Sequence, residues 1–324
     1  MANTQDIWVL TDDRAGNRSQ ALGVAEALGL PYVAKEIGYG PWARLPNVFL
    51  GGATLLGIDA ASRERLTPPW PALVIAAGRR TAPVALAIKR ASGGRSRLVQ
   101  VMHPGAGSGG FDLVCVPRHD PECIGGNVIA ITGAPHGLTA EKLSEARARW
   151  LPELTALTEP RIAVIVGGST RRRPFTAAMA TELGERVSAM ASSVGGSLMV
   201  TTSRRTGEAA DALLAAISAP ARLHRWGDEG DNPYTGFLAT ADQVVVTGDS
   251  VSMCSEACAV PVPVQIFAPP ALITEKHARC HASLYEGGYA HPFSGEVLEG
   301  SHEPLNAAIE IARAIRERGL QPAE

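Results

Sequence analysis

Short apolar runs alternate with longer amphipathic segments over almost the whole chain. The runs Ile7–Leu10, Ala72–Ala77 and Ile162–Val166 contain no polar side chain, which is typical of parallel strands that are buried on both faces. Segments between the runs, such as Pro83–Arg90 and Pro174–Ala191, carry a helical pattern instead. The alternation therefore predicts an α/β fold built from repeated strand–helix units.

The pattern of strands and helices starts again near Thr158-Glu159-Pro160. Two series of similar length predict two Rossmann-like, doubly wound domains. We expect an N-terminal domain of residues 1–157 and a C-terminal domain of residues 158–303, after which the helix Pro304–Arg318 crosses back onto the first domain. The predicted strands are Ile7–Leu10, Tyr32–Ile37, Ala72–Ala77, Leu98–Met102, Phe111–Val116, Val128–Ile131, Ile162–Val166, Leu198–Thr202, Ala221–Trp226, Val244–Val246 and a strand after Pro261. The predicted helices include Gln20–Leu28, Pro83–Arg90, Glu141–Leu157, Pro174–Ala191, Gly207–Ile217, Tyr234–Ala239 and Ala271–Tyr285.

The composition is that of an ordinary folded protein. The chain has 324 residues, of which 45% are hydrophobic, and a net charge of −2, which argues against broad electrostatic binding to nucleic acid. No apolar run reaches the roughly 18 residues of a membrane span, and the N-terminus lacks the pattern of a signal peptide. We expect a cytoplasmic protein, with a peripheral contact to a membrane left open.

The five cysteines do not have the spacing of a metal site. Cys254 and Cys258 lie four residues apart on a predicted helix, and such a pair is usually packing in a reducing compartment. Zinc binding is the alternative for that spacing. The sequence predicts neither a metal nor a resident cofactor.

Residues 242–266 are the most informative stretch for chemistry. The strand Val244–Val246 runs into a loop of small residues that contains Asp249 and Ser250, and a short helix with Ser252, Met253 and Glu256 follows. Free backbone N–H groups at such a turn favour a phosphate. Glu256 lies one and a half turns further on, where a carboxylate can reach ribose hydroxyls. Ser250 and Ser252 are alternatively ordinary helix caps.

Two further loops of the second half contain glycine or arginine after a strand. Gly167, Gly168, Ser169 and Thr170 precede Arg171-Arg172-Arg173, and Ser203, Arg204 and Arg205 follow the next strand. Glycines allow a close approach of the backbone, and guanidinium groups bind a diphosphate in bidentate fashion. We expect an anionic ligand there; the alternative for each arginine cluster is a solvated surface. Asn232 and Tyr234 would edge the base or sugar, although Asn232 is also a plausible helix cap.

Loops of the first half supply the expected acceptor side. Gly16, Asn17 and Gln20 follow Asp12, Arg79 follows Gly78, and His103 and His119 follow later strands. Asp12 or His119 is the expected general base, although a histidine in such a loop is more often a capping residue. A Walker loop, the GxGxxG fingerprint and the Gly-x-Ser-x-Gly elbow are missing from the sequence, which disfavours an ordinary oxidoreductase or hydrolase.

Six stretches resemble a known family: Asp12 to Gln20, Gly78-Arg79, Phe111–Asp120, Thr202–Thr206, Asn232-Pro233-Tyr234 and Thr247–Ala257. They are similar to the plant "elongated mitochondria" fission-factor family and its bacterial homologues, which are described as candidate glycosyltransferases. The resemblance implies a GT-B architecture with a nucleotide-sugar cleft between two domains. Residues 250–256 are also similar to the donor site of the peptidoglycan N-acetylglucosaminyl transferase. That similarity implies that Glu256 holds the ribose, and that Ser250, Ser252 and Met253 line the diphosphate and sugar.

One position departs from the family pattern, because Asp13 stands where the family usually has glycine. If the backbone there needs a positive φ, aspartate tolerates it better than most residues.

The leading hypothesis is a metal-independent glycosyltransferase that moves a sugar from a nucleotide diphosphate donor to an unidentified acceptor, for which a lipid-linked molecule is one expectation. A non-catalytic adaptor is the second hypothesis, since the plant members recruit the fission machinery. A sugar-nucleotide epimerase or hydrolase on the same fold is the third.

Overall fold

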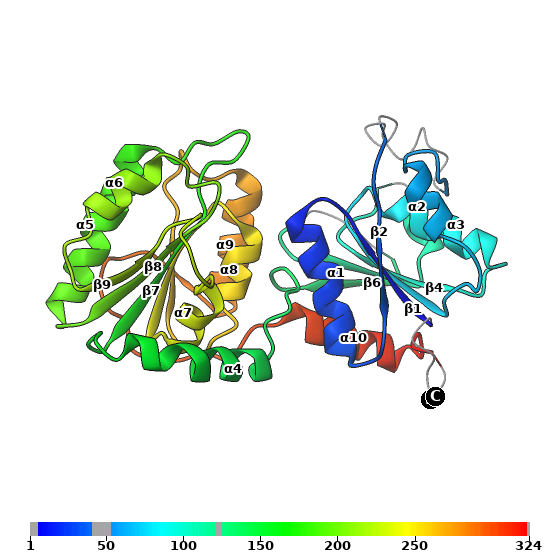
Figure 1. Ribbon diagram of the computed structural model, residues 1–324. Coiled ribbons are helices and arrows are strands. Elements are labelled where there is room, and N and C mark those ends of the chain that lie inside the picture. The colour runs from blue at the N-terminus through cyan, green and yellow to red at the C-terminus, as the bar shows by residue number, and fades with distance from the viewer. Residues whose placement is uncertain (1–5, 41–52, 106, 121–124, 323–324) are drawn as a thin grey trace. The chain divides into compact units, whose positions relative to one another are not determined.

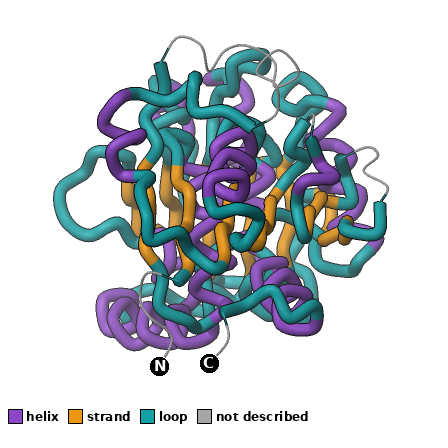
Figure 2. Tube along the Cα trace, turned by 90° about the vertical axis from the view of Figure 1, so that its right-hand side faces the viewer, coloured by secondary structure: helices purple, strands orange, loops and turns teal. Residues whose placement is uncertain are grey.

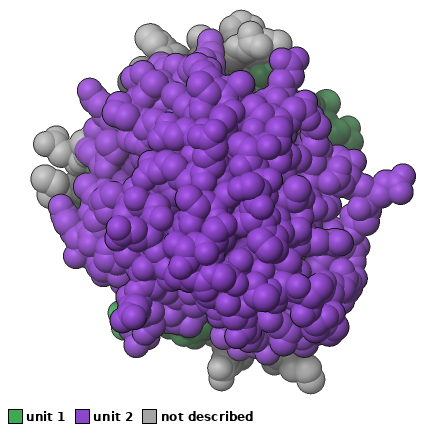
Figure 3. Space-filling model, turned by 90° about the vertical axis from the view of Figure 1, so that its left-hand side faces the viewer, with its two compact units in different colours: residues 1–137, 307–324 green, residues 138–306 purple. Residues whose placement is uncertain are grey.

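The computed structural model describes residues 6–40, 53–105, 107–120 and 125–322. The chain divides into two compact units, which Figure 3 colours separately. Unit 1 comprises Met1–Gly137 and Ala307–Glu324, and unit 2 comprises Leu138–Asn306. In each unit, helices cover both faces of one sheet (Figures 1 and 2).

Unit 1 contains a parallel six-stranded sheet in the order β2-β1-β3-β4-β5-β6. Helices α1 and α10 pack on one face, and α3 packs on the other. The strands are β1 Ile7–Thr11, β2 Val33–Glu36, β3 Leu73–Ala77, β4 Arg97–Val101, β5 Leu113–Pro117 and β6 Val128–Ile131. The helices are α1 Ala15–Leu28, α2 Ala60–Arg65, α3 Ala82–Ala91 and α10 Ala307–Glu317, with a 3-10 turn at Ser108–Gly110.

Unit 2 contains a second parallel sheet in the order β12-β11-β10-β7-β8-β9. Helices α5 and α6 cover one face, and α4, α7, α8 and α9 cover the other (Figure 1). The strands are β7 Arg161–Val166, β8 Ser197–Thr202, β9 Ala221–His224, β10 Gln243–Thr247, β11 Val264–Phe267 and β12 His291–Pro292. The helices are α4 Ala140–Trp150, α5 Ala177–Ser193, α6 Ala209–Ala215, α7 Tyr234–Thr240, α8 Val251–Ala257 and α9 Glu275–Glu286, with a 3-10 turn at Leu151–Leu154.

These arrangements confirm the predicted fold class of two Rossmann-like α/β domains. The apolar runs became strands because both faces of each sheet are covered, as the fully buried β3, β7 and β10 show. The last helix, α10, packs in the core of unit 1 through Ile311 and Ile315, as expected for a helix that crosses back.

The boundary between the units lies earlier than the predicted 157/158. Helix α4 belongs to unit 2, because Trp150 packs edge-on against Phe237 at a centroid distance of 6.2 Å. A Cβ atom on Gly236 would lie 2.2 Å from the Trp150 ring, so this glycine permits the close contact. The predicted helix Glu141–Leu157 also ends at Trp150, just before the 3-10 turn that contains Pro152.

Four other local differences concern unit 1 and the end of unit 2. Helix α1 begins at Ala15 rather than Gln20, so Gly16 and Asn17 lie in its first turn and not in a loop. Helix α2 and the two-residue strand β12 were not expected. Asp13 does not adopt a positive φ; among the described non-glycine residues only Met102 does.

Candidate functional site

The two central strands of unit 2, β7 and β10, lie side by side although the chain visits β8 and β9 between them. Helix α5, which follows β7, covers one face of the sheet, and α8, which follows β10, covers the other. The loops after β7 and β10 therefore diverge at the carboxyl edge of the sheet. Open α/β sheets bind their ligands at such a switch point.

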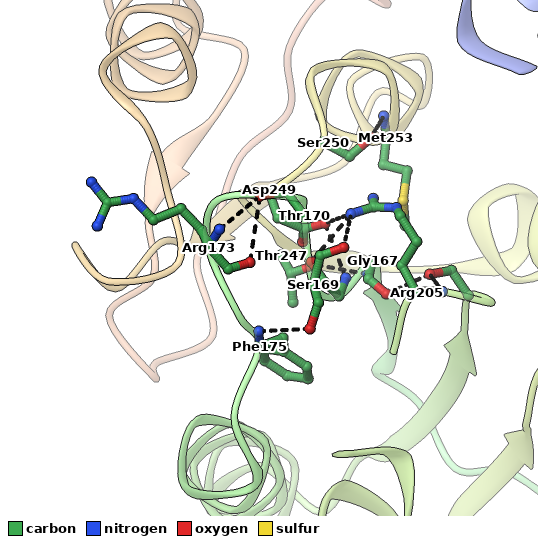
Figure 4. Close-up of polar contacts among 12 residues, drawn as sticks. Gly167, Ser169, Thr170, Arg173, Phe175, Arg205, Thr247, Asp249, Ser250 and Met253 are labelled. Carbon is green, nitrogen blue, oxygen red and sulfur yellow. Dashed lines mark hydrogen bonds and ion pairs between the residues drawn. The ribbon is translucent and has the colours of Figure 1, made fainter. Parts of the chain in front are cut away.

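The turn Gly167-Gly168 after β7 is held from several sides (Figure 4). The Gly167 N–H donates to Thr247 Oγ1 at 2.8 Å, and the Gly168 N–H donates to Asp249 Oδ2 at 2.9 Å. Thr206 Oγ1 donates to the Gly167 carbonyl at 2.6 Å, and Ser203 Oγ donates to the same oxygen. Four side chains, two from the loop after β8 and two from the end of β10 and its loop, thus surround one pair of glycines.

Arg205 completes this arrangement. Its Nη1 atom lies 2.6 Å from Asp249 Oδ2 and donates to the Gly168 and Ser169 carbonyls at 3.1 and 3.3 Å. A Cβ atom on Gly168 would lie 2.2 Å from the Arg205 carbonyl oxygen, so only glycine fits there. Arg205 and Ser203 therefore hold the turn, whereas the sequence predicted that they bind donor.

The N–H groups of this loop are already used. Ser169 N–H donates to the Arg205 carbonyl at 2.9 Å, and Thr170 N–H donates to the Arg173 carbonyl at 2.8 Å. In this conformation the turn therefore bonds to itself and to Asp249, and these N–H groups are not free to bind a phosphate.

The other arginines of the two loops remain available. Arg171, Arg172, Arg173 and Arg204 are exposed, and within the described part of the chain none of their guanidinium groups has a carboxylate partner. Basic side chains without counter-charges at a switch point favour an anionic ligand. The positive charge expected from the sequence is thus present on these four arginines. The guanidinium group of Arg205 is paired with Asp249 instead.

The loop after β10 differs from the loop after β7. Ser250 caps α8 by accepting the Met253 N–H at 3.3 Å, as the capping alternative predicted. Within the described residues, the backbone N–H groups of residues 249–252 have no acceptor. Ser252 and Met253 are half-buried.

Glu256 and Tyr234, chosen independently from the sequence, lie together. Tyr234 Oη donates to Glu256 Oε2 at 2.5 Å, which links α7 to α8. Burial raises the pKa of the Glu256 carboxyl, and the hydrogen bond from Tyr234 acts in the opposite direction. Burial and the nearby Glu256 raise the pKa of the Tyr234 phenol. Asn232 is exposed, and its side chain accepts the Tyr234 N–H at 3.0 Å, but the N-cap residue of α7 is Pro233.

One half-buried residue near the switch point was missed by the sequence analysis. His277 forms a reciprocal capping box with Thr274 at the start of α9: Thr274 Oγ1 accepts the His277 N–H at 3.4 Å, and His277 Nδ1 accepts the Thr274 N–H at 3.3 Å. Burial lowers the pKa of the imidazole, while the charge of Asp249 opposes this shift. The sequence signal was Thr-x-x-His before an amphipathic helix, a variant of the usual capping box.

Unit 1 has its own switch point between β1 and β3, where the Asp12 carboxylate is fully buried. Asp12 accepts hydrogen bonds from the Arg14 N–H at 3.1 Å and from Asn17 Nδ2 at 3.0 Å, and it pairs with Arg80 at 3.3 Å. Arg80 also pairs with Asp13, and its guanidinium stacks over the Tyr39 ring at 4.4 Å. Both oxygens of Asp12 thus take part in holding Arg14, Asn17 and Arg80 in place. The role of Asp12 as a general base stays a prediction.

The remaining acceptor-side residues follow the carboxyl ends of β1, β3, β4 and β5. His119 is buried at 3% exposure in the turn after β5, whereas His103 is exposed and accepts the Gly105 N–H through Nδ1 at 2.9 Å. Arg79 is exposed, Gly16 is half-buried, and the Gln20 side chain is buried. Gln20 Oε1 has no hydrogen-bond partner in the described part of unit 1.

Neither a metal cluster nor a membrane-spanning helix emerges from the described residues. No group of three or more His, Cys, Asp or Glu side chains in them is placed to hold a metal ion. None of the described helices has both the length and the apolar character needed to cross a membrane.

Solved structures share this architecture. The glycosyltransferase SnogD from Streptomyces nogalater matches with a TM-score of 0.53 and 16% identity, over 96% of this chain and 94% of that one. The UDP-GlcNAc 2-epimerase of Methanocaldococcus jannaschii, solved in complex with UDP-GlcNAc and UDP, matches with a TM-score of 0.52 and 11% identity, over 97% and 99%. At these identities the likeness shows the fold, which is that of GT-B glycosyltransferases and related epimerases.

Two curated relatives are similar along the sequence. An uncharacterised protein of Rickettsia prowazekii is 29% identical, over 96% of this chain and 98% of its own length. The mitochondrial fission protein ELM1 of Arabidopsis thaliana is 30% identical, over 82% of this chain and 67% of its own length. A family model described as mitochondrial fission ELM1 matches residues 15–319. The chain therefore belongs to the mitochondrial fission ELM1 family.

Proposed function

We propose that this protein is a glycosyltransferase whose nucleoside diphosphate sugar binds at the carboxyl edge of the unit 2 sheet. The proposal rests on two features of the segments that follow β7, β8, β9 and β10: exposed arginines without carboxylate partners among the described residues, and the Glu256–Tyr234 pair that joins α7 to α8. Each feature supplies something that such a donor requires.

The phosphates of the donor would meet the exposed guanidinium groups of the β7 and β8 loops. Arg204 and the arginines at 171–173 lie there without acidic partners in the described chain. During transfer, negative charge builds up on the leaving diphosphate, and fixed cations stabilise that charge without the help of a metal ion.

The ribose of the donor would meet Glu256. Glu256 is half-buried and receives one hydrogen bond, from Tyr234, through a single oxygen. Its other oxygen can accept a ribose hydroxyl. The fold likeness supports this assignment, since the epimerase with the same architecture was solved with UDP-GlcNAc and UDP.

The chemistry at the acceptor is the second part of the proposal. Asp12 or His119 of unit 1 remains the proposed base that deprotonates an acceptor hydroxyl. The acceptor is unidentified. We expect a lipid-linked molecule, which the protein would reach through a peripheral contact with a membrane.

An epimerase is a second candidate, because the epimerase of the same fold matches this chain as well as the glycosyltransferase does. It would use the same donor pocket and convert the donor without an acceptor. An adaptor is the third candidate, on the strength of the relative named as a mitochondrial fission protein.

A thermal-shift panel of UDP, GDP, ADP, CMP and their common sugars tests the donor site. A ligand at one hundred times its Kd stabilises the protein by about 2.7 kcal/mol. Glu256→Ala should weaken the binding of the selected nucleotide by about 1–3 kcal/mol, because ribose hydroxyls lose their partner. Glu185→Ala, an exposed change on α5, is the control and should bind normally.

Three outcomes separate the candidates. A selective rise with one nucleotide class that Glu256→Ala loses supports the proposed donor site. Conversion of the donor alone, in the absence of any acceptor, favours the epimerase or a hydrolase. Absence of any rise at millimolar nucleotide contradicts the proposal and favours the adaptor.

A further inference from the structure

The Glu256 carboxylate differs from the buried carboxylates that hold the loops together. Asp12 and Asp249 each pair with an arginine and also accept a backbone N–H. Glu256 forms no ion pair within the described residues, and the Tyr234 hydroxyl, a neutral group, is its one donor there. A carboxylate that is removed from water with a single donor is costly to keep ionised. Its spare hydrogen-bonding capacity therefore points to a ligand.

The two oxygens of the Glu256 carboxylate have different surroundings. Oε2 accepts the Tyr234 hydroxyl at 2.5 Å, whereas Oε1 has no partner in the described part of the chain. Oε1 is also not enclosed, in contrast to Asp249 Oδ1, which lacks a partner and is shut off from solvent. A carboxylate oxygen has two lone pairs, so the open oxygen suits two adjacent hydroxyl groups.

Helix α7 holds Tyr234 in place from the core of unit 2. Tyr234 is the first residue of this helix, and its ring packs against the core cluster that contains Trp150. A Cβ atom on Gly236 would lie 2.2 Å from the Trp150 ring, so α7 lies close against α4. Arg147 of α4 donates to the Ala239 carbonyl at 3.0 Å. The Tyr234 hydroxyl therefore reaches α8 from a fixed position.

Helix α8 is fixed in the same core, but the Glu256 side chain has freedom of its own. Cys254, Ala257 and Cys258 of this helix are all 0% exposed. A glutamate side chain has three rotatable bonds, and ordering it costs conformational entropy. The hydrogen bond from Tyr234 holds the carboxylate in one orientation before a ligand arrives. Such pre-organisation increases affinity, because less freedom is lost on binding.

We infer that Tyr234 is a positioning residue, which holds the Glu256 carboxylate in place for the ribose hydroxyls of a ribonucleoside diphosphate. The inference rests on the proposed function and adds two points to it. The site recognises ribose itself, and Tyr234 acts through Glu256 without touching the ligand. A site that binds a hydroxyl group rejects the analogue that lacks it, because the polar group of the protein is then left without its partner.

Calorimetry with UDP, GDP, ADP and their 2′,3′-dideoxy counterparts tests the inference. The dideoxy nucleotides lack both ribose hydroxyls, so the ratio of the two affinities within one protein measures the recognition of ribose. The wild type should bind the preferred ribonucleotide about 10-fold to 150-fold more tightly than its dideoxy counterpart, which is the effect of hydrogen bonds to a charged group. Glu256→Ala should bind both nucleotides nearly equally.

Tyr234→Phe removes only the hydroxyl group and keeps the ring in the core. Its affinity ratio should fall by about 3-fold to 10-fold relative to wild type, which is the effect of one hydrogen bond. The double variant Tyr234→Phe/Glu256→Ala should have the same ratio as Glu256→Ala alone, because Tyr234 acts only through the carboxylate. Tyr285→Phe is the matched control, since Tyr285 is half-buried against the same core cluster and should keep the wild-type ratio.

The results distinguish this inference from the proposed function. A wild-type ratio in Tyr234→Phe, even with weaker binding of both nucleotides, overturns the inference and shows that Tyr234 only supports the fold. A double variant whose ratio differs from that of Glu256→Ala also overturns it, because Tyr234 then contacts the ribose directly. Equal binding of both nucleotides by the wild type overturns the inference and leaves nucleotide binding standing. No binding of any nucleotide to the wild type overturns both.

Discussion

The carboxylate of Asp249 is fully buried and lies 2.6 Å from Nη1 of Arg205, 44 residues away in the sequence. The same carboxylate oxygen accepts the Gly168 N–H. This pair therefore joins the loops after β7, β8 and β10 at the switch point. Arg205 therefore fixes the conformation of the loops at the candidate site. Its sequence neighbour Arg204 is exposed instead.

Replacing the two arginines separately should reveal this difference. Arg205→Ala leaves the Asp249 carboxylate buried without a counter-charge, which should lower the free energy of unfolding by about 3 kcal/mol, the lower end of the range for a broken buried pair, because Arg205 is one-third exposed. Arg204→Ala should leave stability within about 0.5 kcal/mol of wild type and weaken nucleotide binding. Urea denaturation and calorimetry measure the two effects. Equal stability losses in both variants would refute the assignment.

Gly168 should not tolerate a side chain. Its φ is +137°, and a Cβ atom would lie 2.2 Å from the Arg205 carbonyl oxygen. Gly207→Ala is the control, since Gly207 also has a positive φ, of +57°, but open space around it. We expect Gly207→Ala to cost about 1–2 kcal/mol from backbone strain alone. Gly168→Ala should cost clearly more and should also reduce nucleotide binding. A Gly168→Ala protein as stable as Gly207→Ala would show that the turn is looser than described.

Glu256 should make stability depend on pH. Burial raises the pKa of its carboxyl above the ordinary value, so the folded protein holds the proton more tightly than the unfolded chain does. The stability contributed by the protonated form is complete below the unfolded pKa and is lost as the pH rises through the higher folded pKa. Glu256→Gln removes this loss while keeping an oxygen that accepts the Tyr234 hydroxyl.

The stability gain of Glu256→Gln over wild type should accordingly increase as the pH rises from 4, and should become constant above the folded pKa. Urea denaturation at several pH values between 4 and 8 measures it. A difference that does not change with pH would mean that Glu256 titrates as it does in the unfolded chain.

Helix α10 offers a test of the fold of unit 1. Ile311 is fully buried in the core of unit 1, whereas Ile309 on the same helix is 50% exposed. Ile311→Ala should reduce the free energy of unfolding by about 2–5 kcal/mol, while Ile309→Ala should change it by no more than about 0.5 kcal/mol. Chemical denaturation of both variants provides the comparison. Similar costs would indicate that α10 does not pack as described.

The sequence was most informative where burial alone decides the structure. The apolar runs that became β3, β7 and β10 are buried on both faces, so hydrophobicity identified them without knowledge of their neighbours. The crossing of the last helix was also predicted, and α10 packs in the core of unit 1 through Ile311 and Ile315.

Features that depend on distant contacts were not predictable in this way. The true boundary of the units depends on Trp150 packing against Gly236 and Phe237, which lie more than 80 residues away. Likewise, Glu256 and Tyr234 were each chosen as site residues, but their hydrogen bond was not foreseen. The ion pair between Arg205 and Asp249 could not be predicted either, because the sequence does not show that these two residues lie side by side in the fold.

Hydrogen exchange with and without the nucleotide that stabilises the protein most is the direct test of the donor site in unit 2. The account predicts slower exchange in peptides that cover residues 249–256, where the N–H groups of residues 249–252 have no acceptor within the described residues. It also predicts little change at Gly167 and Gly168, whose N–H groups are already bonded. Protection confined to unit 1, or none at saturating nucleotide, would contradict the proposal that unit 2 binds the donor.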